Sequence, residues 1–226
     1  GPSTTSGTFL WAVDQANTNA GADIIQFTAG LQVNASVNPT GSNPFMAEIT
    51  ESVTIDGNGG ALNGNQFWVS QGGIINSLTD CPGNVSGTTQ TSFMPGFLKV
   101  GTPGANNSAI EVTAKNLTIK QFNSIAEVNE NATLIFDNFE AQETWSTWQC
   151  VSESAILART GASLEIYNSI IGDAVMWGIS GLSAAIFGGQ NAGDLTIEGS
   201  ILLNNNLDEQ PAINWDGASG SKVNIV

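Results

Sequence analysis

The sequence predicts an all-β fold, a solenoid of stacked β-strands that begins with a capping helix. The first observation is a repeated pattern, in which a pair of small and branched apolar residues leads through a turn rich in Gly or Asn to an alternating strand of the Leu-x-Ile type. The second is the composition, since only 11% of the residues are charged and 26 are glycine. Short strands joined by turns have this composition, whereas amphipathic helices carry more Glu and Lys.

The spacing of the repeats supports a stacked array. The strand anchors are separated by 17, 30, 31 and 28 residues, and periods of roughly 20–50 residues are typical of stacked repeats. A length of 226 residues suits one domain of this kind. The anchors are Leu117, Leu134, Leu164, Leu195 and Val223.

A capping helix is expected within residues 6–20, with Ser6 or Thr8 as its N-cap. A strand at 23–27 follows, and a helix before the first strand would cover apolar surface and backbone groups at the open end of the stack. Four apolar residues fall at the i, i+3, i+4, i+7 spacing of one helical face. They are Phe9, Ala12, Val13 and Ala16.

The charge balance excludes several classes of function. Five Lys and Arg stand against 20 Asp and Glu, so the formal net charge is −15. Such a surface repels phosphate backbones and anionic lipid, so we expect no nucleic-acid partner. We also expect no membrane insertion, because no run approaches the roughly 18 apolar residues of a membrane span. The absence of histidine excludes Ser-His-Asp and Cys-His catalytic centres and histidine-ligated zinc.

The opening of the chain resembles a known family. The run GTFLWAVDQANTNAGADIIQF, followed by ITESVTIDGNGGALNG, is similar to the start of exported bacterial β-helix surface proteins, among them adhesins and chlamydial polymorphic membrane proteins. Their openings read SLREAI…AN…GADTI and then VTIDG. The likeness covers roughly residues 7–65, and Phe9-Leu10-Trp11 departs from it, because Leu-Arg-Glu is expected there.

The resemblance implies a right-handed, single-stranded parallel β-helix of the pectate-lyase-like type, displayed outside the cell or on its surface. It implies no catalytic activity, because one fold carries many functions. We expect residues 1–226 to form a single domain, a fragment of a larger surface protein. Residues 1–3 resemble a tag remnant and 76–96 a long loop excursion.

Three consecutive repeats are longer than the 17-residue step, by 13, 14 and 11 residues, each time after the Leu-x-Ile strand. Insertions at one place in successive repeats map to one face of a solenoid. Three of the six tryptophans lie in these insertions. Aromatic faces beside acids and amides suit a sugar, and a peptide nearly as well, although the rings could instead pin their own loops to the body. The predicted ligand-binding residues are Trp145, Trp148, Trp177, Glu143, Asp173 and Asp208.

The leading hypothesis is therefore a non-catalytic module that binds carbohydrate, or another ligand on a host or neighbouring cell. A structural stalk or spacer remains open. So does a polysaccharide hydrolase or lyase, for which Asp137, Glu165 and Glu198 are the candidate outward carboxylates. Lys120 is expected to pair with Asp137 across neighbouring strands, an ordinary ion pair in the simplest interpretation.

Two further features are left open by the sequence. Cys81 and Cys150 could form a disulfide in an exported protein or remain free thiols. No cofactor is expected, and calcium is a weak possibility at Asp208-Glu209 or at Asp56 with Asn58, neither of which follows an established calcium-loop pattern.

Overall fold

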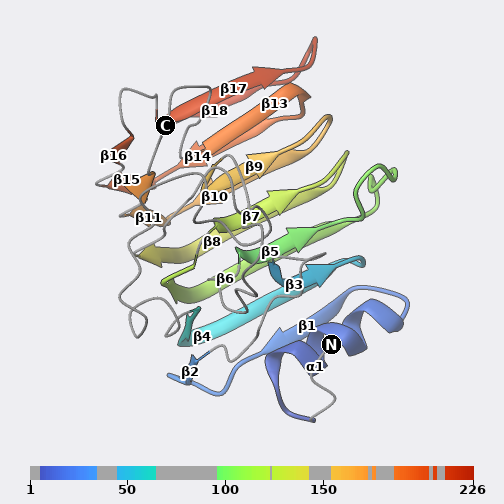
Figure 1. Ribbon diagram of the computed structural model, residues 1–226, viewed down its shortest axis with the longest axis vertical. Helices are drawn as coiled ribbons and strands as arrows, with labels where there is room; N and C mark the ends of the chain where they lie inside the picture. Colours follow the sequence, from blue (N-terminus) through green and yellow to red (C-terminus); the bar gives the residue numbers. More distant parts are fainter. Residues whose placement is uncertain are drawn as a thin grey trace, which may run out of the picture.

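The computed structural model describes residues 6–34, 45–64, 96–122, 124–142, 154–172, 175–176, 186–203, 206–207 and 212–226. Over these residues the fold is all-β, with parallel sheets and one short helix, α1 (Phe9–Thr18). A large sheet of ten strands and a small sheet of six enclose one hydrophobic core, and two further strands pair with each other (Figure 1). The expected all-β class with parallel strands is thereby confirmed.

The large sheet contains β1 (Asp23–Gln26), β2 (Gln32–Asn34), β4 (Val53–Asn63), β6 (Glu111–Lys120), β8 (Thr133–Gln142), β10 (Ser163–Tyr167), β11 (Ile170–Gly172), β14 (Leu195–Glu198), β15 (Ile201–Leu203) and β18 (Val223–Ile225). The small sheet contains β3 (Phe45–Ile49), β5 (Gly96–Val100), β7 (Ser124–Val128), β9 (Ile156–Ala158), β13 (Ile186–Ala192) and β17 (Ile213–Gly217). The separate pair is β12 (Val175–Met176) with β16 (Asn206–Leu207).

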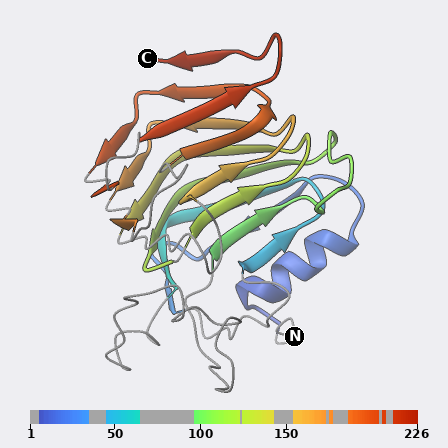
Figure 2. The same ribbon diagram turned by 45° about the horizontal axis from the view of Figure 1, so that its top comes forward.

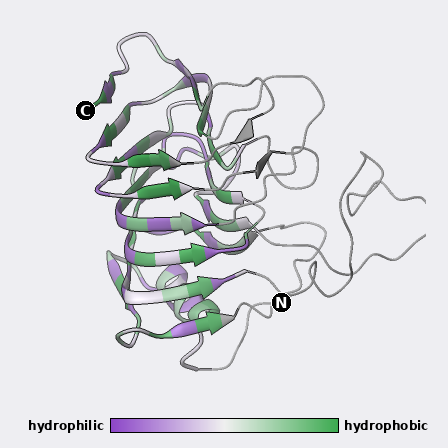
Figure 3. Ribbon diagram, turned by 90° about the vertical axis from the view of Figure 1, so that its left-hand side faces the viewer, coloured by the Kyte–Doolittle hydropathy of each residue, from purple (hydrophilic) through white to green (hydrophobic). Residues whose placement is uncertain are grey.

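The chain alternates between the two sheets, so that each repeat lies beside the repeat before it (Figure 2). Four of the predicted anchors line up in register, Leu134 with Leu164, Leu164 with Leu195, and Leu195 with Val223. Leu134, Leu164 and Leu195 are fully buried, and hydrophobic and hydrophilic residues alternate along the strands of the large sheet (Figure 3). Stacks of this kind supply most of the stability, since a buried Leu or Ile contributes roughly 1.5–3 kcal/mol.

The remaining predicted anchor, Leu117, is wrong. Leu117 pairs with Phe139, and it is Val112 that pairs with Leu134, so the shortest repeat is 22 residues long and not 17. The reason is that β6 and β8 are ten-residue strands with two apolar pairs each. The Leu-x-Ile pattern marks the second pair in β6 but the first pair in β8. The expected pairing of Lys120 with Asp137 fails for the same reason, because Lys120 is in register with Gln142 and Asp137 with Lys115.

In β6 and β8, one residue in the middle of the strand shifts the alternation of buried and exposed side chains. Along β8 the buried positions are Leu134 and Phe136, then Phe139 and Ala141, with the exposed Asn138 between the two pairs. Asn138 has φ 50°, in the left-handed region. A strand whose side chains alternate strictly would leave one pair outside the core, and the left-handed residue restores both pairs to the inside while the strand bends.

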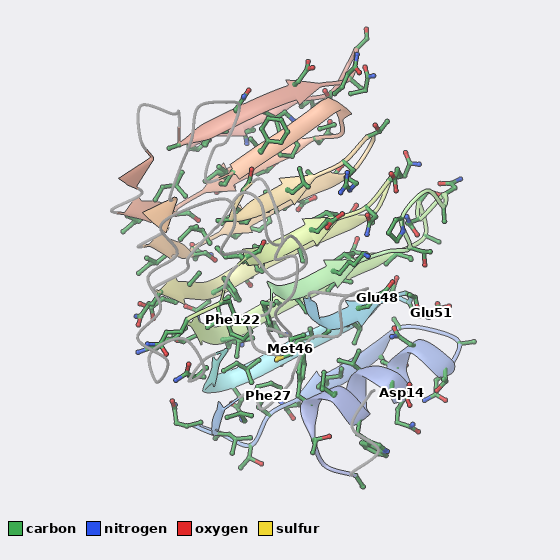
Figure 4. All side chains as sticks on the ribbon, viewed as in Figure 1. Asp14, Phe27, Met46, Glu48, Glu51 and Phe122 are labelled. Carbon is green, nitrogen blue, oxygen red and sulfur yellow. The ribbon has the colours of Figure 1, made fainter. Side chains whose placement is uncertain are left out.

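Helix α1 covers one end of the stack, as the sequence predicts. It starts at the N-cap Thr8, whose hydroxyl accepts a hydrogen bond from the Trp11 amide at 3.2 Å. Val13 and Ala16 are buried, and the rings of Phe9 and Phe27 pack edge to face with their centroids 5.7 Å apart. At this end Phe27, Met46 and Phe122 lie within the body, whereas Asp14, Glu48 and Glu51 lie toward the side where α1 ends (Figure 4).

Asn17 makes hydrogen bonds to the edge of β3 that a neighbouring strand would otherwise make. Its side-chain amide donates to the Glu48 carbonyl at 2.8 Å, and its carbonyl oxygen accepts from the Thr50 amide at 2.8 Å. An unpaired sheet edge can pair with other chains, and this one carboxamide satisfies a donor and an acceptor of the edge. The helix therefore covers both the apolar core and part of the backbone edge.

Replacing Asn17 with Ala should lower the free energy of unfolding by about 1–3 kcal/mol, because two hydrogen bonds to the sheet edge are lost. Chemical denaturation measures this loss, and hydrogen exchange of the Thr50 amide should accelerate. Asp14→Ala, at an exposed position of the same helix, should change neither quantity appreciably. Equal effects of the two substitutions would contradict this role of Asn17.

Candidate functional site

A ladder of asparagines runs along the bend of the large sheet. Asn58, Asn116, Asn138 and Asn168 occupy the bend on four neighbouring strands and have φ between 49° and 51°. Asparagine is one of the few residues with a side chain that enters the left-handed region readily. Gly30 and Gly199, with φ 67° and 57°, occupy the bend on the two flanking levels. The ladder is therefore four amides long.

Hydrogen bonds between side chains connect the ladder from strand to strand. The Asn138 amide donates to Oδ1 of Asn116 at 2.9 Å, and the Asn116 amide donates to Oδ1 of Asp56 at 3.1 Å. The Asn168 amide donates to Oδ1 of Asp137 at 3.4 Å. Each carboxamide has two donor hydrogens and one acceptor oxygen, so each keeps hydrogen-bonding capacity after its ladder contact.

Two serines, the buried Ser169 and the partly exposed Ser200, continue the bend where the sheet strands are interrupted. Ser169 accepts a hydrogen bond from the Phe139 amide at 3.0 Å and donates to the Tyr167 carbonyl at 2.6 Å. Ser200 in turn accepts from the Ser169 amide at 3.0 Å. These hydroxyls satisfy backbone groups that lose their strand partners between β10 and β11 and between β14 and β15.

A groove of about 490 Å³ lies along the ladder. One wall carries the four asparagines, and the other carries Thr118, Glu140 and Ile170, which are in register on β6, β8 and β11. Glu140 is held in place from two sides. Its carboxylate accepts from the Thr118 hydroxyl at 3.4 Å and from the Gln142 amide. The groove is therefore a row of amides that faces a hydroxyl, a carboxylate and an aliphatic side chain.

Ionisable residues follow the outer face of the large sheet beside the groove. Asp56, Lys115, Asp137, Tyr167 and Glu198 stand in register on five successive strands. Lys115 Nζ lies 3.9 Å from Oδ2 of Asp56. A half-exposed pair of this kind contributes at most about 1 kcal/mol. Three of the five residues are acids and one is a lysine, so the border of the groove carries a net negative charge.

The candidate carboxylates of the enzyme hypothesis are brought to one face. Asp137 and Glu198 flank Tyr167 in register, and the Tyr167 hydroxyl donates to Oε2 of Glu165 at 2.8 Å. This bond, together with burial and the negative charges of Glu165 and Glu198, raises the pKa of Tyr167 above 10.0. Asp137 and Glu198 are two strand spacings apart, about 9.6 Å between their backbones.

The predicted ligand-binding residues Trp145, Trp148, Trp177, Glu143, Asp173 and Asp208 lie outside the described residues, as do Cys81, Cys150 and residues 76–95 of the expected 76–96 excursion, whose last residue, Gly96, begins β5. Measured against the true 22-residue repeat, the three longer repeats exceed it by 8, 9 and 6 residues. In the chain, these additional residues lie between β8 and β9, between β11 and β13, and between β15 and β17. Glu143 and Asp173 therefore follow directly on the strands that carry Glu140 and Ile170.

The asparagine ladder was missed at the sequence level, although a signal is present. The residues Val112, Leu134, Leu164 and Leu195 each begin a run of alternating apolar residues that ends in Asn or Gly at the fifth position. Choosing Leu117 as an anchor put the first copy out of phase and concealed the recurrence.

Asp56 is part of the ladder. Its Oδ1 accepts one hydrogen bond from the side-chain amide of Asn116 and one from the backbone N–H of Asn58. Among the residues that the structure describes, no group of three acids or cysteines is arranged to hold a metal ion.

Within the same residues, no helix is long and apolar enough to cross a membrane. Comparison with family models, curated proteins and solved structures finds no match.

Asn138→Ala should destabilise the protein by about 1–2 kcal/mol more than Asn138→Gly. Both substitutions remove the amide, but alanine alone is strained in the left-handed conformation. Urea denaturation of the two variants isolates this backbone effect, because each serves as the control for the other. Equal stability of the two variants would show that the left-handed conformation carries no cost here.

The amide of Asn116, reinforced by Asn58 and Lys115, holds the pKa of Asp56 below its ordinary value of 3.8. The stability that ionised Asp56 confers on the fold is therefore present above the ordinary pKa of the carboxyl group. It is lost as the pH falls through the lowered pKa of the folded state. In Asn116→Gly, which keeps the backbone conformation, the pKa of Asp56 should rise toward its ordinary value. Titration of the Asp56 carboxyl carbon by NMR measures the change, and an unchanged pKa would contradict the assignment.

Proposed function

We propose that this chain is a right-handed parallel β-helix module of an exported bacterial surface protein, and that it binds carbohydrate in adhesion. The observation that carries the proposal is the groove along the asparagine ladder. Its amides, hydroxyl and carboxylate match the donors and acceptors of sugar hydroxyls, and Ile170 offers an apolar contact for a sugar face. The β-helix and the extracellular location are supported by the alternation between two parallel sheets, by the capping helix and by the family resemblance of the opening.

The charge of the groove favours a neutral or amine-bearing glycan. Glu140 lines the groove, Asp56 and Asp137 border it, and the whole chain carries −15. A uronic acid or a sulfated sugar would place like charges side by side in a partly desolvated site, which is unfavourable. The insertions belong to the same proposal, because Glu143 and Asp173 begin directly beyond the strands of one wall. We assign Trp145, Trp148 and Trp177 to stacking on the glycan.

Immobilised glucan, mannan, chitin and polygalacturonate test the proposal. We expect binding of one or more of the three uncharged polymers and none of polygalacturonate. Glu140→Ala should weaken binding about tenfold or more, because a hydrogen bond to a charged group is lost. Glu111→Ala, an exposed acid at the start of β6, is the matched control and should leave binding unchanged.

Intrinsic tryptophan fluorescence tests the role of the insertions. A bound glycan should change the emission, and Trp145→Ala or Trp177→Ala should abolish part of that change. A protein that binds no glycan, host-cell surface or neighbouring-cell surface would overturn the proposal and leave the spacer hypothesis.

A second candidate function is glycoside hydrolysis, favoured by the register that places Asp137 and Glu198 on either side of Tyr167. The two carboxylates of inverting hydrolases lie roughly 6.5–9.5 Å apart, which side chains on these two strands can reach. The same polymers, incubated with the protein, should then release reducing ends, and Asp137→Asn or Glu198→Gln should abolish the release. Binding without release would exclude hydrolysis of these polymers.

A further inference from the structure

The groove has a repeat length set by the sheet itself. Adjacent strands lie about 4.8 Å apart, and each of the strand levels β6, β8 and β10–β11 contributes one amide and one residue of the opposite wall. These pairs are Asn116 with Thr118, Asn138 with Glu140, and Asn168 with Ile170. A ligand that lies along the groove therefore meets an asparagine amide again at every strand, while the opposite wall changes from a hydroxyl to a carboxylate to an aliphatic side chain.

The ladder also has two defined ends. Asn58 is its first amide and Asn168 its last, and the flanking levels carry Gly30 and Gly199 at the same bend. A glycine there keeps the left-handed backbone but offers no side chain to a ligand. The row of amides therefore spans three strand spacings, about 14 Å.

We propose that the groove binds an extended glycan parallel to the direction of stacking, with one sugar unit per strand and about four units in contact. This inference rests on the proposed carbohydrate-binding function and specifies its ligand as a straight, β-1,4-linked chain. One unit of such a chain is about as long as one strand spacing, so each strand level meets one sugar. Neighbouring units are turned over relative to each other, so each asparagine meets a hydroxyl from one edge or the other of its sugar, and equivalent hydroxyls recur at every second strand. A coiled α-1,4-linked chain leaves this register after a short distance.

The amides are suited to this task because the ladder fixes their orientation. Asn138 is held by Asn116, and Asn116 is held by Asp56, each through one amide hydrogen. The second hydrogen of each amide group remains for a ligand. Since the side chains are already ordered, little rotamer entropy is lost when a ligand binds.

Dimers through octamers of β-1,4-linked glucose, mannose and N-acetylglucosamine, titrated by calorimetry, test the inference. In the series that binds, affinity should rise about three- to tenfold with each unit up to the tetramer and then level off. The α-1,4-linked glucose series, which has the same sugar in a curved chain, should show no such rise. Affinity that is independent of length, or that keeps rising to the octamer, would overturn the inference while leaving carbohydrate binding intact.

Asn168→Gly provides the second test, because it removes the last amide and keeps the left-handed backbone. It should shift the point at which affinity levels off from the tetramer to the trimer. Asn191→Gly is the matched control, since Asn191 is exposed and has φ 58° but lies near the end of β13, away from the groove. If affinity still levels off at the tetramer in Asn168→Gly, the proposed match of one sugar unit to each strand is wrong. Failure of all three β-linked series to bind would overturn the carbohydrate proposal itself.

Discussion

The left-handed residue at the bend of the large sheet is the constraint on which the other features depend. Without it, a ten-residue strand such as β8 would bury Leu134 and Phe136 and expose the second apolar pair. With it, both pairs enter the core and the strand turns a corner. Because the residue recurs on successive strands, it also fixes the register, and a shift of one residue would expose a whole set of apolar side chains.

The same constraint explains the groove. Once the backbone must enter the left-handed region, only glycine and a few polar residues are tolerated at low cost, and asparagine is foremost among them. In a parallel sheet in register, equivalent residues stack at one strand spacing. A conformational requirement of the fold thus produces a row of amides, and Asp56 anchors that row at one end. The polar groove is a by-product of the corner, available for binding because its amides are not fully used.

The first and last described strands of the stack differ in how much of their apolar surface is covered. At the N-terminal end α1 buries Val13 and Ala16 and Asn17 pairs with the edge of β3. At the other end Val223 and Ile225 occupy the same core stacks as Leu195 and Ile197 but are 55% and 58% exposed. The comparison shows how much of the burial of each strand comes from its neighbour along the stack, because identical positions change from buried to exposed when that neighbour is missing.

The sequence by itself determined the class of fold, the capping helix and most of the register. These follow from local periodicity, since the spacing of Phe9, Ala12, Val13 and Ala16 defines a helical face, and the alternation around Leu134 or Leu164 defines an inward stripe. The sequence analysis misplaced the first repeat, because Leu117 lies in the second half of the bent strand β6 and pairs with Phe139 and not with Leu134. The groove was decided only by the tertiary structure. Asn58 and Asn116 are neighbours because two strands 58 residues apart in the chain are paired side by side, and no local pattern encodes that contact.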